Sequence, residues 1–421
     1  MKSLKVFLAV MLLVASLSAN SFADTEFPLG KETKGLSVKI DDDTKFNIRI
    51  RLQPRFDIGE TSTSLKADDG KSYTSINDMY LRRVRFEMGG NLTKNFKFGA
   101  ELEADKTGKQ DHTASTYAYH LFGDYKFSDT FSLFFGKKKL PYSRVSLSSS
   151  SKQLIIERPS VTEDAKKFFG DSTGHGYYGP QIMLHGKLAE GMFKYYASVT
   201  DAWQAGQTTK WTSKVVEKSG LGYIGRVEIS PPGWVEEKQS DAHLGEGSHL
   251  TLSGHYGAQS GIEYGPTKTT TTTASLTTGA VTSTTTSTPN NDKEDRTLTG
   301  FDLSFHLGGL AIQGEYVSME ITPSTTGTKA IKPNGYYFQA GYYINGTAFE
   351  PAFRYEYYNK DSNKTDDDQT TTTFGFNWYP KGHSFKIGAN YTTTTFGKGN
   401  SGKLANDDNL SSFQIQSQIY F

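Results

Sequence analysis

The chain has 421 residues and no cysteine, and phenylalanine, tyrosine and tryptophan together make up 13% of it. Its 46 basic and 45 acidic residues nearly balance, which argues against a nucleic-acid-binding protein. Outside the N-terminus the sequence has no apolar run of about 20 residues, so it predicts no transmembrane helix in the mature chain. Many aromatic residues at low mean hydropathy are typical of half-apolar β-strands.

The N-terminus is predicted to be a signal peptide that ends at residue 23. Two lysines precede an apolar core, residues 6–17, and Ser21 and Ala23 are the small residues of a cleavage site. An uncleaved anchor is the alternative, but the apolar run is short for one. The mature chain, residues 24–421, is then a single domain with 44 basic and 45 acidic residues.

The clearest strand pattern runs from Phe46 to Asp57. Every second side chain is apolar, and polar side chains that include Arg49, Arg51 and Arg55 lie between them. A strand sends alternate side chains to opposite faces, so one face is apolar and the other carries three guanidinium groups. In a transmembrane barrel lipid contacts the apolar face and water fills the interior. The rest of the chain favours the barrel over a soluble sheet, and the arginines then line a pore.

The same alternation recurs along the chain. In the strand expected at 80–88, Arg83 and Arg85 share a face with Glu87, and a polar loop is expected at 59–77. Long loops alternate with short turns, as in outer-membrane barrels. The sequence therefore predicts an all-β fold, a transmembrane antiparallel β-barrel of about 16 strands. Further strands are expected at 96–103, 117–127, 131–135, 182–188, 193–199, 223–229, 250–256, 301–306, 310–316, 336–343, 349–357, 374–378, 385–391 and 413–421.

Residues 137–175 interrupt the alternation. The segment is long for a loop and contains apolar residues 154–156 and a short predicted helix at 161–169, which are too apolar for a fully solvated loop. The segment is therefore expected to fold into the barrel and narrow it. A solvated loop start is the alternative for its lysines. Its basic side chains are Lys137, Lys138, Lys139 and Arg144.

A threonine-rich segment, residues 267–289, is too polar to bury a core and is predicted to be a mobile external loop. A role of this loop in surface adhesion is an alternative, or an additional, function of the barrel. The histidines are scattered without the spacing of a metal site, and no catalytic motif is evident, so the sequence predicts neither a metal, a cofactor nor an enzyme.

The sequence resembles the phosphate-selective porin O and P family. The resemblance rests on GKKKLPYSRVSLSSSSKQLIIERPS at 136–160, on Tyr178-Gly179-Pro180-Gln181 and Leu184-His185-Gly186, and on RRVRFEMGG at 82–90. It implies a sixteen-stranded, homotrimeric outer-membrane channel whose third external loop folds inward. It also implies a pore lined by basic side chains that passes anions, in some members phosphate. The residues that match this lining are Arg49, Arg51, Arg55, Arg83, Arg85, Lys137, Lys138, Lys139 and Arg144.

The C-terminal residue, Phe421, ends an alternating strand and resembles the recognition signal of bacterial outer-membrane barrels. We therefore expect the barrel-assembly machinery and outer-membrane lipid as partners.

The expected function is passive diffusion of small anions, with phosphate as a candidate solute. The alternative is a general porin with weak or cation preference, because nearby acids could cancel the field of the arginines. These acids are Glu87, Glu101, Glu103 and Asp105.

Overall fold

The computed structural model describes residues 35–66, 72–110, 113–166, 168, 178–201, 214–274, 281–288, 292–325, 327–399 and 409–421. The predicted signal peptide lies outside these residues.

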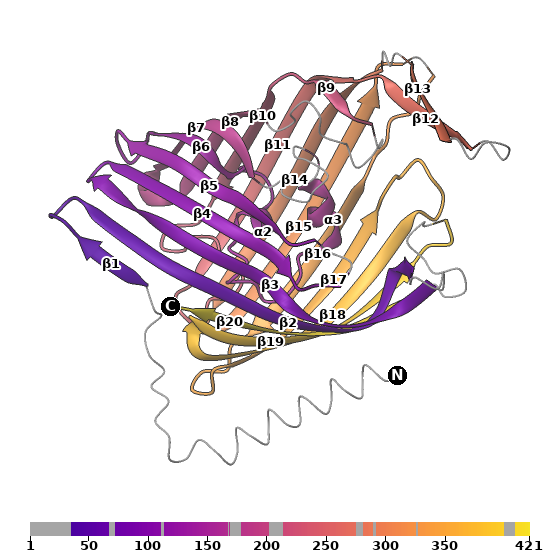
Figure 1. Ribbon diagram of the computed structural model, residues 1–421. Coiled ribbons are helices and arrows are strands. Elements are labelled where there is room, and N and C mark those ends of the chain that lie inside the picture. Colours follow the sequence, from indigo (N-terminus) through magenta and orange to yellow (C-terminus); the bar gives the residue numbers. More distant parts are fainter. Residues whose placement is uncertain are drawn as a thin grey trace.

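The described residues form one antiparallel sheet of 18 strands, of which all but β1 and β9 close into a ring of sixteen (Figure 1). The ring closes where β20 pairs with β2, and Phe421 extends this pairing through its backbone contacts with Ile50. This confirms the predicted barrel and strand number. The ring strands are β2 (Lys45–Lys66), β3 (Ser72–Thr93), β4 (Phe96–Thr107), β5 (Ser115–Lys126), β6 (Ser132–Lys139), β7 (Tyr178–Leu188), β8 (Phe193–Thr200), β10 (Gly222–Ile229), β11 (His249–Tyr264), β14 (Lys293–Leu307), β15 (Leu310–Pro323), β16 (Asn334–Tyr342), β17 (Phe349–Asn359), β18 (Asp368–His383), β19 (Phe385–Phe396) and β20 (Asn409–Tyr420).

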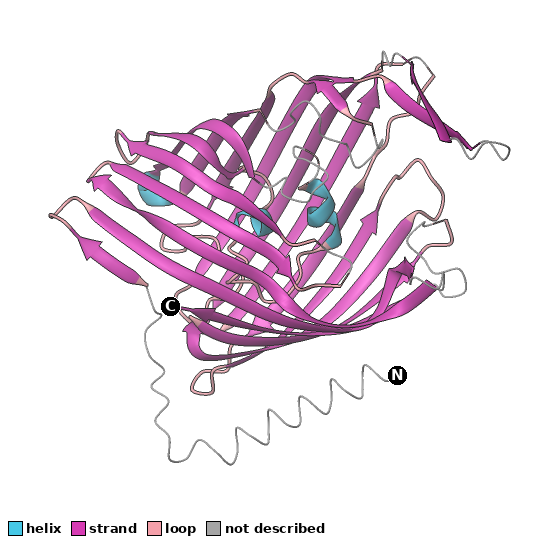
Figure 2. Ribbon diagram, viewed as in Figure 1, coloured by secondary structure: helices cyan, strands magenta, loops and turns pink. Residues whose placement is uncertain are grey.

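Four short strands and three short helices complete the described fold (Figure 2). β1 pairs with β2, β9 pairs with β11, and β12 and β13 pair with each other. Within the threonine-rich segment, residues 267–274 and 281–288 thus pair as regular antiparallel strands, which the sequence analysis did not predict. The elements are β1 (Leu36–Lys39), β9 (Val216–Lys218), β12 (Thr267–Ala274), β13 (Val281–Thr288), α2 (Arg144–Leu147), α3 (Ser160–Ala165) and the 3₁₀ turn η1 (Ala189–Gly191).

The two faces of the barrel wall differ in the way that the alternation predicts. Along β14, Phe301 and Leu303 are exposed, whereas Asp302 and Ser304, which alternate with them, are buried. Exposed apolar and buried polar side chains are the reverse of a soluble protein and suit a wall that has lipid outside it. We call the two surfaces the apolar face and the polar face. Among the described residues, no helix is long and apolar enough to cross a membrane.

The prediction of a loop at 59–77 is wrong in part, because β2 and β3 continue through most of these residues. Gly59 pairs with Ile76, and the ladder resumes beyond a bulge at Leu65 and Tyr73. Apolar and polar side chains must alternate along a strand only where lipid covers one of its faces. A strand that extends past the lipid can be polar on both faces, and it then resembles a loop in the sequence.

The long insert begins later than predicted. Residues 137–139 belong to β6 and pair with residues 178–180 of β7, so the connection starts at Leu140 rather than Lys137. We call residues 140–168, of which 167 is not described, the β6–β7 connection. It contains α2 and α3, and α3 matches the start of the helix expected at 161–169.

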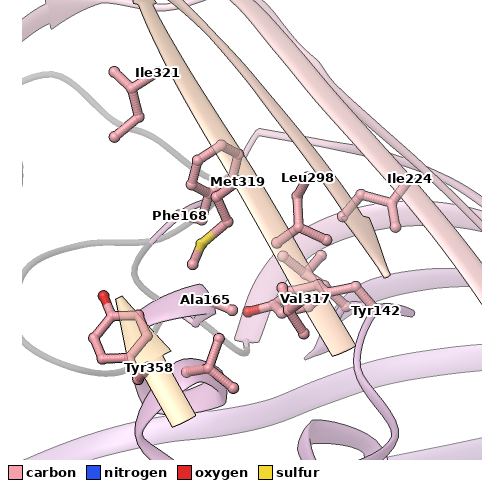
Figure 3. Packing of buried hydrophobic residues seen from close by; sticks show 11 residues of the cluster. Tyr142, Ala165, Phe168, Ile224, Leu298, Val317, Met319, Ile321 and Tyr358 are labelled. Atoms are coloured by element: carbon pink, nitrogen blue, oxygen red, sulfur yellow. The ribbon is translucent and has the colours of Figure 1, made fainter. Parts of the chain in front are cut away.

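The β6–β7 connection packs on the polar face of the wall. Phe168 and Ala165 lie in a buried cluster with Leu298 of β14 and Met319 of β15 (Figure 3). Its backbone also accepts hydrogen bonds from wall side chains on β17, β18, β19 and β20. The donors are Arg354, Asn377, Lys386 and Gln418.

A second long connection, residues 230–248, joins β10 to β11. It lies at the end of the barrel where the other connections are short, such as Gly308–Gly309 between β14 and β15. The backbone N–H groups of Asp241 and Ala242 donate to the carbonyl of Lys152 at 3.2 and 2.9 Å. The β10–β11 connection and the β6–β7 connection therefore meet, although they start from opposite ends of the barrel.

Candidate functional site

A cavity of about 840 Å³ lies between the polar faces of β2 to β8 and the two connections. Basic side chains outnumber acidic ones around it, seven to three. The basic residues are Lys45, Arg49, Arg51, Arg85, Lys138, Lys139 and Lys238, and the acidic residues are Glu87, Glu101 and Asp124.

The arginines of the cavity are held by carboxylates on neighbouring strands. Arg51 Nη2 lies 2.9 Å from Glu87 Oε1, and Arg49 pairs with the same carboxylate. Arg85 Nη1 lies 2.8 Å from Glu101 Oε1. These pairs fix the guanidinium groups in place and offset part of their charge.

The two lysines at the end of β6 have different partners. The Nζ of Lys138 lies 4.5 Å from the centroid of the Phe122 ring. No carboxylate in the described chain lies within ion-pair distance of it. Lys139 Nζ instead donates to the carbonyls of Leu147 at 3.1 Å and Ser148 at 2.6 Å. The N–H groups of Lys139 are thus taken up by backbone carbonyls, whereas the ammonium group of Lys138 lies over an aromatic ring.

The structure brings five of the nine predicted site residues to this cavity and places four elsewhere. Arg55 pairs with Asp57 and Glu157, and Arg83 donates to Gln53 at 3.1 Å. Lys137 and Arg144 are not in the cavity lining either. Arg55 and Arg83 are buried side chains of β2 and β3 that lie outside the lining of this cavity. That all nine residues line the pore stays a prediction. The four are Arg55, Arg83, Lys137 and Arg144.

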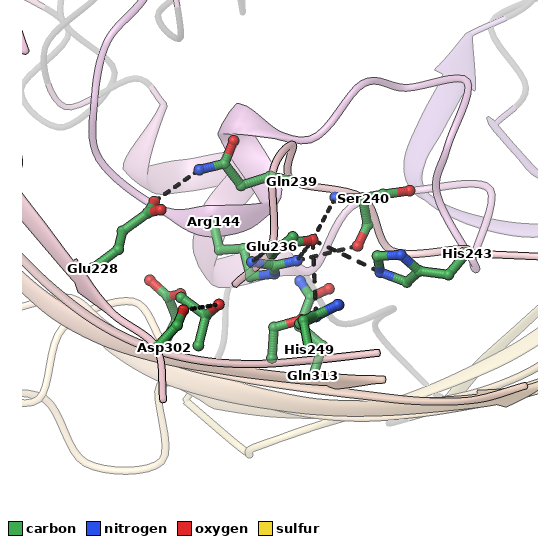
Figure 4. A network of polar contacts seen from close by, with 12 residues as sticks. Arg144, Glu228, Glu236, Gln239, Ser240, His243, His249, Asp302 and Gln313 are labelled. Atoms are coloured by element: carbon green, nitrogen blue, oxygen red, sulfur yellow. Dashed lines mark hydrogen bonds and ion pairs between the residues drawn. The ribbon is translucent and has the colours of Figure 1, made fainter. Parts of the chain in front are cut away.

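Arg144 instead forms a buried ion pair with the β10–β11 connection (Figure 4). Its Nη1 and Nη2 each lie 2.6 Å from a carboxylate oxygen of Glu236, and Nη2 also donates to the carbonyl of Ser240 at 3.1 Å. Burial alone would raise the pKa of Glu236, but the Arg144 guanidinium outweighs it and lowers this pKa. The pair joins α2 to the opposite connection.

Glu157 joins the middle of the β6–β7 connection to the wall. Its carboxylate accepts a hydrogen bond from Arg55, and Arg82 Nε lies 3.9 Å away. Burial would raise the pKa of Glu157, but Arg55 and Arg82 hold it well below its usual range. The two guanidinium groups therefore stabilise the ionised form of this carboxylate.

We expect Glu157→Gln to lower the free energy of unfolding at pH 7 by about 1–2 kcal/mol, since the amide loses a charge-assisted hydrogen bond. Because the pKa of Glu157 is lowered by folding, its contribution is complete above the unfolded value of about 4.3 and is lost as the pH falls through the folded value. The difference between the variant and the wild type should therefore narrow in strong acid. Denaturant titrations in detergent at neutral and acidic pH measure it.

Glu190→Gln is the matched control, because Glu190 is exposed in the turn between β7 and β8. It should leave the stability unchanged at both pH values. A Glu157→Gln deficit that persists unchanged into strong acid would contradict the role of the ionised carboxylate.

Several lining residues were missed by the sequence analysis. Lys45 and Asn47 continue the series of Arg49 and Arg51 at every second position, so the period of the strand could have found them. Lys238 lies on the β10–β11 connection, and no sequence pattern indicates that it approaches the cavity.

Comparison with known proteins places the barrel in a family. An uncharacterized protein of Aquifex aeolicus is 35% identical over 403 residues, which span 89% of this chain and 87% of that protein. The anion-selective porin from Comamonas acidovorans has a TM-score of 0.58 at 13% identity, over 90% of this chain and 100% of that chain. The trimer form of OmpT from Vibrio cholerae has a TM-score of 0.52 at 10% identity, over 90% and 100%. A model of the phosphate-selective porin O and P family matches residues 48–421, and the chain therefore belongs to that family.

Proposed function

We propose that this outer-membrane channel conducts small anions by passive diffusion and that phosphate is among them. The observation that carries the proposal is the excess of cationic side chains around the cavity, seven against three acidic ones. An excess of fixed positive charge attracts anions and repels cations.

The arrangement of the cations suits conduction rather than tight binding. Arg49, Arg51 and Arg85 are partly neutralised by their acids, so each attracts an anion weakly. Lys138 adds a cation without an acidic partner among the described residues. Successive weak sites let an ion enter and leave, as a channel requires. The planar guanidinium groups also match the oxygens of phosphate.

The β6–β7 connection is, in this proposal, the constriction of the channel. Its support is the set of contacts that the connection makes with the polar face of the wall, from Arg296 on β14 to Arg51 on β2. The contact with the β10–β11 connection supports the same role, because it holds the β6–β7 connection in place from the opposite end of the barrel.

A general porin is the second candidate, and the acids favour it. Glu87, Glu101 and Asp124 share the cavity with the cations. Cations that face acids across a constriction create a transverse field, which allows both signs of ion to pass. The measured selectivity decides between the two candidates.

The proposal includes a homotrimer and assembly through the C-terminal residue. The trimer form recorded for OmpT, a protein of similar fold, supports the oligomer. The backbone of Phe421 pairs with Ile50 of β2 at 2.8 and 3.1 Å, so this residue completes the ring. A residue at the closing seam is suitably placed for recognition by the barrel-assembly machinery.

We expect Lys138→Gln to lower the ratio of chloride to potassium permeability by a factor of about two to five, since one unit charge contributes up to about 1 kcal/mol at 4 Å in water. The reversal potential in a planar bilayer under a KCl gradient gives this ratio. Phosphate should also block the chloride current less in the variant than in the wild type.

Lys137→Gln is the matched control, because it removes the same charge one residue earlier on β6 and Lys137 does not line the cavity. It should leave the permeability ratio close to that of the wild type. Equal effects of the two substitutions would contradict the assignment of Lys138 to the conduction path.

A further inference from the structure

Three histidine side chains converge where the β10–β11 connection meets the wall. His243 belongs to the connection, His249 begins β11, and His306 lies near the end of β14. The His243 ring centroid is 4.6 Å from that of His249 and 4.5 Å from that of His306. One ring nitrogen from each residue lies within 4.8 Å of the other two.

His306 is held in the tautomer that a metal ligand needs. Its Nδ1 lies 3.0 Å from the carbonyl oxygen of Gly247. A carbonyl can only accept a hydrogen bond, so Nδ1 carries the proton and Nε2 keeps a free lone pair. Ligand histidines typically donate their second N–H to a carbonyl or carboxylate in this way, which fixes the tautomer.

The surroundings of the three rings also favour a cation. His249 and His306 are buried, so their rings are shielded from competing water. The Oε1 atom of Glu236 lies 3.7 Å from His243 Nε2 and 3.8 Å from His249 Nε2. Figure 4 shows this carboxylate between Arg144 and the histidines. Glu236 thus places one carboxylate oxygen near two of the rings, with its charge partly offset by Arg144.

We propose that His243, His249 and His306 bind one divalent transition-metal ion of the zinc class. Imidazole nitrogen is a preferred ligand of Zn²⁺, Cu²⁺ and Ni²⁺, and three histidines with one open position form a known type of tetrahedral site. The ligand nitrogens of such a site lie about 3.3 Å apart, so the rings close in when the ion binds. His243 can supply this movement because it lies on a connection and not on a paired strand.

A bound ion would tie the β10–β11 connection to β11 and β14. The sequence conceals the site, because residues 243, 249 and 306 come from three different elements and have no motif spacing.

The test is calorimetric titration of ZnCl₂ into the purified full-length protein in detergent, after removal of metal with a chelator. We expect one zinc ion per chain, with nitrogen ligands at about 2.0–2.1 Å in zinc-edge X-ray absorption. His243→Gln and His306→Gln should each weaken the affinity by at least about 10- to 100-fold. Heat-modifiable migration in SDS gels shows that each barrel is folded.

His185→Gln is the control, since His185 pairs with Asp124 at 3.0 Å, outside the cluster. This variant should bind zinc with the affinity of the wild type. The proposal is overturned if the wild type binds no zinc, if His243→Gln binds as tightly as the wild type, or if His185→Gln loses as much affinity as His243→Gln.

Discussion

Replacing Arg144 by alanine should free the β6–β7 connection from the β10–β11 connection and raise the single-channel conductance. The substitution leaves the Glu236 carboxylate buried without its bidentate partner. Breaking a buried ion pair from one side costs about 3–5 kcal/mol. Since about 1.4 kcal/mol is a tenfold change in an equilibrium, the docked position of the connection should lose most of its population advantage.

Planar-bilayer recordings give the conductance of this variant, and the rate of tryptic cleavage within residues 140–168 reports how often the connection undocks. The double variant Arg144→Met with Glu236→Met is the matched control. Exchange of both charges for apolar side chains of similar volume is often close to neutral. It should therefore resemble the wild type more than Arg144→Ala does. A single variant with wild-type conductance and wild-type cleavage rate would show that this pair does not hold the connection.

The second large effect concerns the lipid contact of the wall. Phe301 is 62% exposed on the apolar face of β14, six residues before the strand ends at Leu307. We expect Phe301→Arg to lower the free energy of unfolding from a bilayer by about 2–4 kcal/mol, the cost of a guanidinium near the middle of the membrane. Reversible denaturant unfolding in lipid vesicles measures this change.

Leu307→Arg is its matched control, because Leu307 lies on the same face of the same strand but at its end, and is 50% exposed. Near the interface the cost falls to about 0–1 kcal/mol. Phe301→Leu separates the charge from the loss of the ring contact with Tyr316. Equal costs for Phe301→Arg and Leu307→Arg would contradict the depth assigned to the apolar face.

The sequence predicted the barrel because the membrane imposes a rule on every strand. Lipid outside and polar groups on the opposite face require alternation, and Phe46 to Asp57 obeys it. Beyond the lipid the side chains need not alternate, and for this reason β2 and β3 were predicted to be shorter than they are. The start of the long connection was misplaced for a related reason, since Lys137, Lys138 and Lys139 lack alternation although they are paired in β6.

The site was predicted less completely, because its geometry depends on strand register. The alternation places Arg49 and Glu87 on the polar face, but a slip of two residues would keep every face unchanged. Only the register that sets Arg49 opposite Glu87 decides which acid offsets which arginine. The contact between Arg144 and Glu236 joins two segments that are 92 residues apart, and no local pattern indicates it.

The central claim is that the cationic excess around the cavity makes the channel prefer anions. The reversal potential of the purified wild-type protein in a planar bilayer under a KCl gradient tests it most directly. Our account predicts a potential displaced toward the chloride equilibrium potential. A potential near zero, or one displaced toward potassium, would mean that Glu87, Glu101 and Asp124 cancel the field, and it would contradict the account.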